Sequence, residues 1–216
     1  GIILTNSCVE LSRHLDRYVV SQDKTYEPFL YKHLKGTEKA KARLLYYFPL
    51  QETSATAAAE DSWIGWHNDS GFLTALAGDI YVDHQTGKIV ENPDPQAGLY
   101  ISRQDKVHQV AIPHDCLMIQ VGECTQIVSN SWILPTPHCV KGIKGSVARC
   151  SLACFVDVPP YVKLSSNNPD AVLSNHPTTS SRVPALAERW TNNMAFGDFL
   201  AKTFVQYYEW TQKLDA

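Results

Sequence analysis

The close spacing of short apolar runs constrains the fold of this chain most strongly. From residue 63 to residue 160, short runs of β-branched and apolar residues follow one another, with only turn-like segments between them. No helical stretch separates them, whereas βαβ units need a crossover of a dozen or more residues. The pattern therefore predicts a mainly β fold, and we expect a double-stranded β-helix (jelly roll) rather than a parallel sheet.

Recognisable turn signals separate the expected strands. One β-rich run is closed by Pro49, and the segment from Asp83 to Gly87 is typical of a hairpin loop. The expected strands are residues 43–48, 71–76, 80–82, 88–90, 99–101, 107–112, 116–121, 125–128 and 148–156, with another near Val140.

Helical patterns flank this region. Apolar spacings near 3.6 predict a helix over residues 9–20, and an apolar stripe predicts a C-terminal helix that begins near Pro184 or Phe196. Residues 51–61 are expected to be a solvated connection and residues 165–182 an irregular loop. We interpret residues 1–216 as a single domain, with a helical lead-in (1–42), a jelly-roll core (43–160) and a loop with a C-terminal helix (161–216).

Composition restricts the partners and the compartment. A net charge of −3 gives no reason to expect nucleic acid or an anionic membrane surface as a partner. No apolar run approaches the ~18 residues of a membrane span, and we expect that the first residues of the chain are not a signal peptide, because they lack a basic region and a small-residue cleavage pattern. Six Cys without a Cys-x-x-Cys pair favour free thiols and a cytoplasmic location. Since the chain begins with Gly1 rather than Met, we expect a processed product or a fragment of a longer protein. Nothing in the sequence predicts an oligomeric state.

His67 and Asp69 form the first candidate site. On an extended strand, residues two apart point to the same face, so this His-x-Asp pair offers one imidazole nitrogen and one carboxylate oxygen together. The pair alone is a weak signal, because His-x-Asp occurs by chance in many chains.

Three further residues strengthen this interpretation. In a jelly roll, neighbouring antiparallel strands would bring His138 close to the His67–Asp69 pair. Two His and one carboxylate form a facial triad that leaves open positions on a metal ion. Eleven residues after His138, Arg149 and Ser151 share one strand face, and a guanidinium beside a hydroxyl suits a carboxylate ligand.

Taken together, these motifs resemble a known family. The similar segments are residues 43–47 (RLLYY), 67–74 (HNDSGFLT), 98–101 (GLYI), 122–130 (GECTQIVSN), 138–140 (HCV) and 149–153 (RCSLA). Their order and spacing resemble the isopenicillin N synthase-like branch of the non-haem Fe(II)- and 2-oxoglutarate-dependent oxygenases. The resemblance covers about residues 43–158, with a weaker similarity at 196–200.

The resemblance implies a function. His67, Asp69 and His138 would bind Fe(II), and Arg149 and Ser151 would hold the distal carboxylate of 2-oxoglutarate, the co-substrate. Tyr47 matches the family tyrosine that donates to the same carboxylate. The implied activity is that of a dioxygenase, which hydroxylates, desaturates or cyclises a small organic substrate and releases succinate and CO₂.

Several alternatives stay open on sequence grounds. One is a 2-oxoglutarate-independent Fe(II) oxidase of the isopenicillin N synthase type, in which the Arg-x-Ser pair grips a substrate carboxylate. Another is a non-catalytic jelly-roll binding module. A thiol enzyme that pairs Cys139 with His138 is disfavoured, because adjacent strand residues face opposite ways. Structural zinc is disfavoured by the spacing of the Cys and His residues.

Overall fold

A computed structural model describes residues 1–50, 62–104, 106–175 and 184–214 of the chain, so the expected connection at 51–61 lies outside the described residues. In chain order the elements are α1 (Ile2–Gln22), α2 (Leu30–Leu34), β1 (Ala40–Tyr47), β2 (Ser62–His67), β3 (Leu73–Asp83), β4 (Ile89–Val90), β5 (Gly98–Arg103), β6 (Lys106–Val110), β7 (Leu117–Val121), α3 (Glu123–Val128), β8 (His138–Lys141), β9 (Val147–Val156), β10 (Lys163–Leu164), α4 (Pro169–Ser174), α5 (Leu186–Arg189), β11 (Met194–Ala195) and α6 (Phe196–Leu214).

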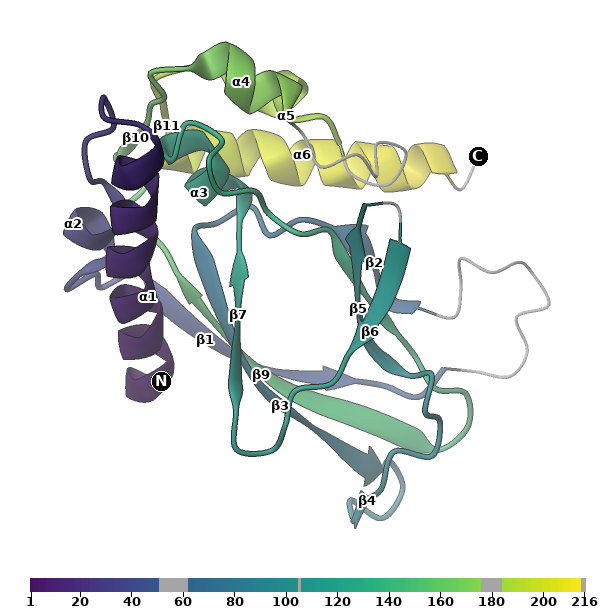
Figure 1. Cartoon of the computed structure of the whole chain (residues 1–216). Helices are drawn as coiled ribbons and strands as arrows, with labels where there is room; N and C mark the ends of the chain where they lie inside the picture. The colour runs from purple at the N-terminus through teal and green to yellow at the C-terminus, as the bar shows by residue number, and fades with distance from the viewer. Residues whose placement is uncertain (51–61, 105, 176–183, 215–216) are drawn as a thin grey trace.

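Two antiparallel sheets form the centre of the molecule (Figure 1). The larger sheet has the order β1-β9-β3, and both β4 and β7 pair with β3. The smaller sheet has the order β2-β8-β5-β6. Strands that are distant in sequence pair with each other, as β1 and β9 do in the larger sheet. The predicted mainly β jelly roll with helices at both ends is confirmed.

The inner and outer faces of the larger sheet follow from strand alternation. Leu44 and Tyr46 of β1 are 77% and 41% exposed, so they mark the outer face. Leu45 and Tyr47 therefore point inward, and each lies opposite a buried residue of β9. This alternation gives the barrel an interior that is distinct from its outer surface.

The flanking helices cover parts of this barrel. Helix α1 extends further in both directions than predicted, and it packs against β3 and β9. The buried carboxylate of Asp16 in α1 accepts the backbone N–H groups of Leu30 and Tyr31 and the Tyr26 hydroxyl, which fixes the start of α2. The C-terminal helix α6 begins at Phe196, as expected, and runs across one end of the barrel (Figure 1).

Three local predictions were wrong. Residues 125–128 lie in helix α3 rather than in a strand, because this short apolar run is buried on all sides and periodicity cannot distinguish the two. The strands expected at 71–76 and 80–82 are one strand, β3, with an irregularity inside it. Within the expected loop at 165–182, α4 forms where the side chain of Asn168 accepts from the backbone N–H of Ala171 and Pro169 occupies the first turn. Residues 176–182 of that loop lie outside the described residues.

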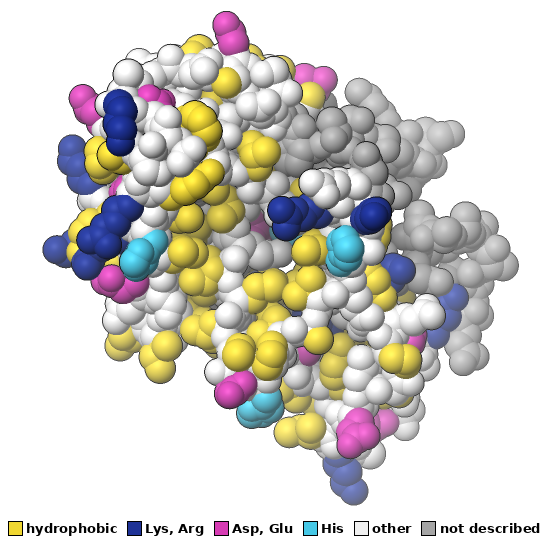
Figure 2. All heavy atoms as spheres, viewed as in Figure 1, with side chains coloured by type: hydrophobic (Ala, Val, Ile, Leu, Met, Phe, Trp, Pro, Cys, Tyr) yellow, Lys and Arg dark blue, Asp and Glu magenta, His cyan; other side chains and the backbone are white. Residues whose placement is uncertain are grey.

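The surface combines apolar and charged regions. Figure 2 shows hydrophobic side chains across the middle of the face in view, with Lys and Arg side chains both at its edge and close to its centre. None of the helices in the described part of the chain has the length and apolar character that crossing a bilayer requires.

Candidate metal centre

Strand pairing brings the two predicted histidines together. Strands β2 and β8 are antiparallel neighbours, and His67 lies directly opposite His138. Their ring centroids are 4.2 Å apart. Directly opposed residues on one sheet face are the closest neighbours that a sheet offers, so one ion between the strands is within reach of both imidazoles.

Asp69 completes the cluster from outside the strand. We expected it on the same strand as His67, but β2 ends at His67 and Asp69 lies in the loop that follows. Its Oδ1 atom is nevertheless 3.8 Å from Nε2 of His138. One ligand atom from each of the three side chains lies within 4.8 Å of the others, as a shared cation requires.

Each imidazole is held by a backbone carbonyl two residues before it. Nδ1 of His67 lies 2.8 Å from the oxygen of Gly65, and Nδ1 of His138 lies 3.1 Å from the oxygen of Thr136. A carbonyl oxygen only accepts, so each Nδ1 carries the proton and donates it. The Nε2 lone pair of each ring is thereby left for a metal ion.

The protein environment keeps the imidazole of His67 neutral. Desolvation inside the barrel, together with the nearby His138, lowers its pKa from 6.5 to about 4, although Asp69 acts in the opposite direction. The ring is therefore uncharged at neutral pH, which is the form that binds a metal.

Helix α3 positions the loop that carries Asp69. The backbone N–H of Glu123 donates to the carbonyl of Asp69 at 2.8 Å, and the N–H of Cys124 donates to that of Gly71 at 3.0 Å. Gly122 precedes the helix, and a Cβ atom there would overlap the backbone oxygen of Gly71. The missing side chain thus allows helix and loop to approach each other closely.

The predicted carboxylate clamp lies on the inner face of β9. Arg149 and Ser151 are 4% and 5% exposed, and they lie opposite Tyr47 and Leu45 of β1. The guanidinium of Arg149 sits 5.0 Å from the centre of the Tyr47 ring. Desolvation raises the pKa of Tyr47, against the lowering effect of Arg149, so the hydroxyl stays a neutral donor.

One residue of this clamp escaped the sequence reasoning. Asp79 of β3 accepts a hydrogen bond from Nη2 of Arg149 at 2.6 Å. The only signal in the sequence is that Gly78-Asp79 interrupts an otherwise apolar run, which is typical of a bulge. The sequence did not reveal that Asp79 pairs with Arg149.

Buried polar atoms without partners test whether the proposed ligands fit. Among the described residues, Oδ2 of Asp69 and both Nε and Nη1 of Arg149 are buried and make no hydrogen bond. Buried polar groups are almost always paired in native proteins, so these atoms are suited to groups bound from outside the chain. An acceptor at the metal centre and two donors at the clamp match a cation and a carboxylate respectively.

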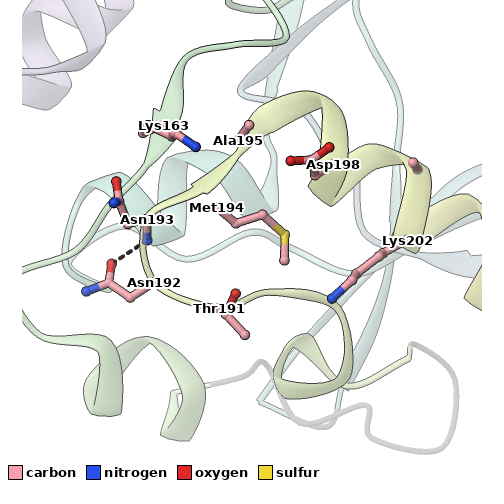
Figure 3. Close-up of a pocket in the computed structure, with 9 residues that line it drawn as sticks. Lys163, Thr191, Asn192, Asn193, Met194, Ala195, Asp198 and Lys202 are labelled. Carbon is pink, nitrogen blue, oxygen red and sulfur yellow. Dashed lines mark hydrogen bonds between the residues drawn. The ribbon is translucent and has the colours of Figure 1, made fainter.

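Away from the His–Asp–His cluster, a surface hollow lies between β10, β11 and the start of α6 (Figure 3). It has a volume of about 480 Å³, and Lys163, Asn192, Asp198 and Lys202 are among the residues that line it. All four residues are exposed, and neither the His–Asp–His cluster nor the clamp contributes to its lining. It is an open surface hollow, separate from the metal centre.

Comparisons with known proteins agree with this geometry. No protein-family model matches the chain. It is 28% identical over 128 residues to 1-aminocyclopropane-1-carboxylate oxidase homolog 3 of Arabidopsis thaliana, an alignment that covers 57% of this chain and 29% of that protein. Homolog 2 of the same plant is 29% identical over 126 residues. The chain thus spans under a third of the length of these curated relatives.

Solved structures with the same fold include a full-length Neurospora crassa protein crystallised in complex with alpha-KG (2-oxoglutarate). It has a TM-score of 0.52 and 17% identity, over 78% of this chain and 45% of that one. A Shewanella oneidensis protein assigned as an oxygenase has a TM-score of 0.52 and 21% identity, over 75% of this chain and 53% of its own length. The chain thus shares the fold of these two solved structures and is similar in sequence to the two plant oxidase homologs. The shared fold places the cluster and the clamp within one barrel.

Proposed function

We propose that this chain carries the catalytic centre of an Fe(II)- and 2-oxoglutarate-dependent oxygenase that oxidises a small organic molecule and releases succinate and CO₂. The convergence of His67, Asp69 and His138, with ligand atoms within 4.8 Å of one another, carries the proposal. Two imidazoles and one carboxylate form the donor set typical of non-haem Fe(II) oxygenases.

Each of the three side chains has an atom that is available to bind the metal. His67 and His138 would each bind the metal through Nε2, since their Nδ1 atoms are engaged with carbonyl oxygens. Asp69 would bind through its carboxylate, whose Oδ2 has no hydrogen-bond partner among the described residues. When bound, Fe(II) supplies the activation of O₂ that no amino-acid side chain provides.

The clamp would hold the far end of the co-substrate. Arg149 has two buried donor nitrogens without partners in the described part of the chain, and Ser151 lies two residues along the same face. A planar guanidinium donates to a carboxylate with defined geometry, so it would orient 2-oxoglutarate as well as attract it. The neutral hydroxyl of Tyr47, across the strand pair, is the third candidate donor.

Anaerobic titration tests the proposal. Purified protein receives Fe(II) and then 2-oxoglutarate, and the visible absorption of the iron–oxo-acid complex is recorded. We expect one equivalent of Fe(II) to bind and a visible band to develop on addition of 2-oxoglutarate. Arg149→Ala should bind Fe(II) normally but need much more 2-oxoglutarate to develop the band. His84→Ala, which alters an exposed histidine outside the cluster, is the control.

The possible negative results separate the rival functions. Iron binding without the band would favour the 2-oxoglutarate-independent oxidase, in which Arg149 grips a substrate carboxylate. Failure to bind Fe(II) at all would favour the non-catalytic binding module.

A further inference from the structure

An irregularity in β3 lies directly across from the clamp. In the pairing of β3 with β9, Ala77 lies opposite Leu152 and Ile80 lies opposite Cys150. Two residues of β3, Gly78 and Asp79, therefore face the single residue Ser151. This two-against-one arrangement is a β-bulge, a device that redirects a side chain and often occurs beside functional sites.

The bulge aims Asp79 at the clamp arginine. Oδ1 of Asp79 accepts from Nη2 of Arg149 at 2.6 Å, and the two side chains are 21% and 5% exposed. The guanidinium also lies over the ring of Tyr47. These contacts engage one nitrogen and one face of the guanidinium, while Nε and Nη1 have no hydrogen-bond partner among the described residues.

An arginine side chain needs such an anchor to act as a clamp. Its long, flexible stem has many rotamers, and each one that is populated in the empty site must be given up when a ligand binds. A carboxylate that holds one nitrogen fixes the plane of the guanidinium in advance, so less freedom is lost on binding. The same carboxylate also balances the buried positive charge, which would otherwise be costly without a ligand.

We infer that Asp79 is a positioning residue for the carboxylate clamp, which it aligns by holding Nη2 of Arg149. The inference rests on the proposed function, because it assigns Arg149 to the distal carboxylate of 2-oxoglutarate. Asp79 itself would touch neither the metal nor the reacting atoms. Its effect would be confined to the affinity for the co-substrate.

The test measures Fe(II) affinity and 2-oxoglutarate affinity separately, by anaerobic calorimetry on the full chain. Asp79→Ala should weaken 2-oxoglutarate binding by at least ~10-fold and change Fe(II) affinity by less than about twofold, as expected for a residue that orients a ligand without touching it. Asp79→Asn should restore most of the affinity, since the amide oxygen still accepts from Nη2. Asp83→Ala, the same substitution on the same strand, is the matched control, because Asp83 bonds to Thr86 instead.

Each outcome decides between defined alternatives. If Asp79→Ala binds 2-oxoglutarate as tightly as the wild type, Asp79 does not align the clamp; tighter binding would make Asp79 a competitor of the ligand. Both results overturn the inference alone. If the wild type binds Fe(II) but no 2-oxoglutarate, the proposed co-substrate and the inference fail together. Should Asp79→Ala not fold, Asp79→Ser, too short to reach Nη2, carries the same expectation.

Discussion

At the scale of single residues, the histidines proposed as metal ligands are positioned by their immediate neighbours. The carbonyl that holds each histidine belongs to the residue two positions earlier, so the orientation of the ring is encoded locally. Because each carbonyl is only two residues from its ring, the contact is set by the local path of the chain. Loss of one ligand should therefore leave the other two in place.

His138→Ala should lower Fe(II) affinity by at least ~100-fold, since loss of a ligand costs more than loss of a supporting contact. The far-UV circular dichroism should stay unchanged, because the β8 backbone pairing does not involve the side chain. His84→Ala removes an exposed ring that bonds to Tyr46 and should keep full affinity. Anaerobic calorimetry measures both affinities; near-equal values for the two variants would exclude His138 as a ligand.

Asp157 gives a prediction for the pH dependence of stability. Its carboxylate accepts the backbone N–H of Phe72 at 3.0 Å, yet desolvation raises its pKa from 3.8 to about 6. The folded state therefore favours the protonated carboxyl. The stabilisation that this proton contributes is complete below the unfolded pKa, and it is lost as the pH rises through about 6.

Asp157→Asn keeps an acceptor for Phe72 but carries no charge. We expect it to be more stable than the wild type near neutral pH, by up to roughly 3 kcal/mol, the free energy that corresponds to the pKa shift. The difference should shrink as the pH falls toward 4. Urea unfolding of both proteins across this range measures it, and a difference that does not vary with pH would contradict the assignment.

At the scale of secondary-structure elements, the loop that bears Asp69 depends on helix α3. Gly122→Ala should destabilise the fold by about 1–3 kcal/mol, because the added methyl group overlaps the backbone of Gly71. It should also weaken Fe(II) binding, since helix and loop must separate. Gly65→Ala is the matched control: it lies on β2, near the same ligands, and an added Cβ there meets no atom within 4 Å. Denaturation and metal titration distinguish the two variants.

Most elements could be predicted, and the exceptions have a common cause. Strand β9 was evident because its residues are mostly apolar and lie between the turn signals of Gly145 and Pro159. Helix α3 was mistaken for a strand because four residues are too few to reveal a period. Its helical form depends on hydrogen bonds from Glu123 and Cys124 to a loop more than fifty residues earlier. Likewise, the bulge that directs Asp79 arises from pairing with β9, a relation that no local pattern contains.

At the scale of the whole molecule, a buried ion pair joins the C-terminal region to the neighbourhood of the metal centre. Arg189 donates two hydrogen bonds of 2.6 Å to Glu123, and both residues are fully buried. Arg189 also donates to Thr203 of α6. Helices α3, α5 and α6 thus share one polar network across a long sequence separation.

Removing one partner of this ion pair should destabilise the fold more than removing both. Arg189→Met leaves a buried carboxylate uncompensated, so we expect a loss of about 3–5 kcal/mol in the free energy of unfolding. Combining it with Glu123→Leu should cost less than the sum of the two single changes, with a coupling of at least ~1 kcal/mol. A double-mutant cycle by urea denaturation measures the coupling. Simple additivity would show that the pair contributes no specific interaction.

The motif order allowed the ligand set to be named from the sequence, but the way it is supported depends on the tertiary structure. His67, Asp69 and His138 could be proposed because their order and spacing resemble the motifs of a known family; strand alternation alone would have placed Asp69 on β2, which ends at His67. Asp79, Glu123 and Arg189 could not, because their partners lie many residues away and charged residues are normally solvated.

The irregular pairing of β2 has a consequence for how the empty and loaded proteins behave. β2 is an outer strand of the smaller sheet, and its pairing with β8 is interrupted by two register shifts. An ion held between His67 and His138 would link the end of β2 to β8. Saturating Fe(II) at a hundred times its dissociation constant would add about 2.7 kcal/mol to stability. We expect the end of β2 to open more often in the apo-protein than in the Fe(II)-bound protein. Amide hydrogen exchange along β2 should therefore slow markedly when Fe(II) binds.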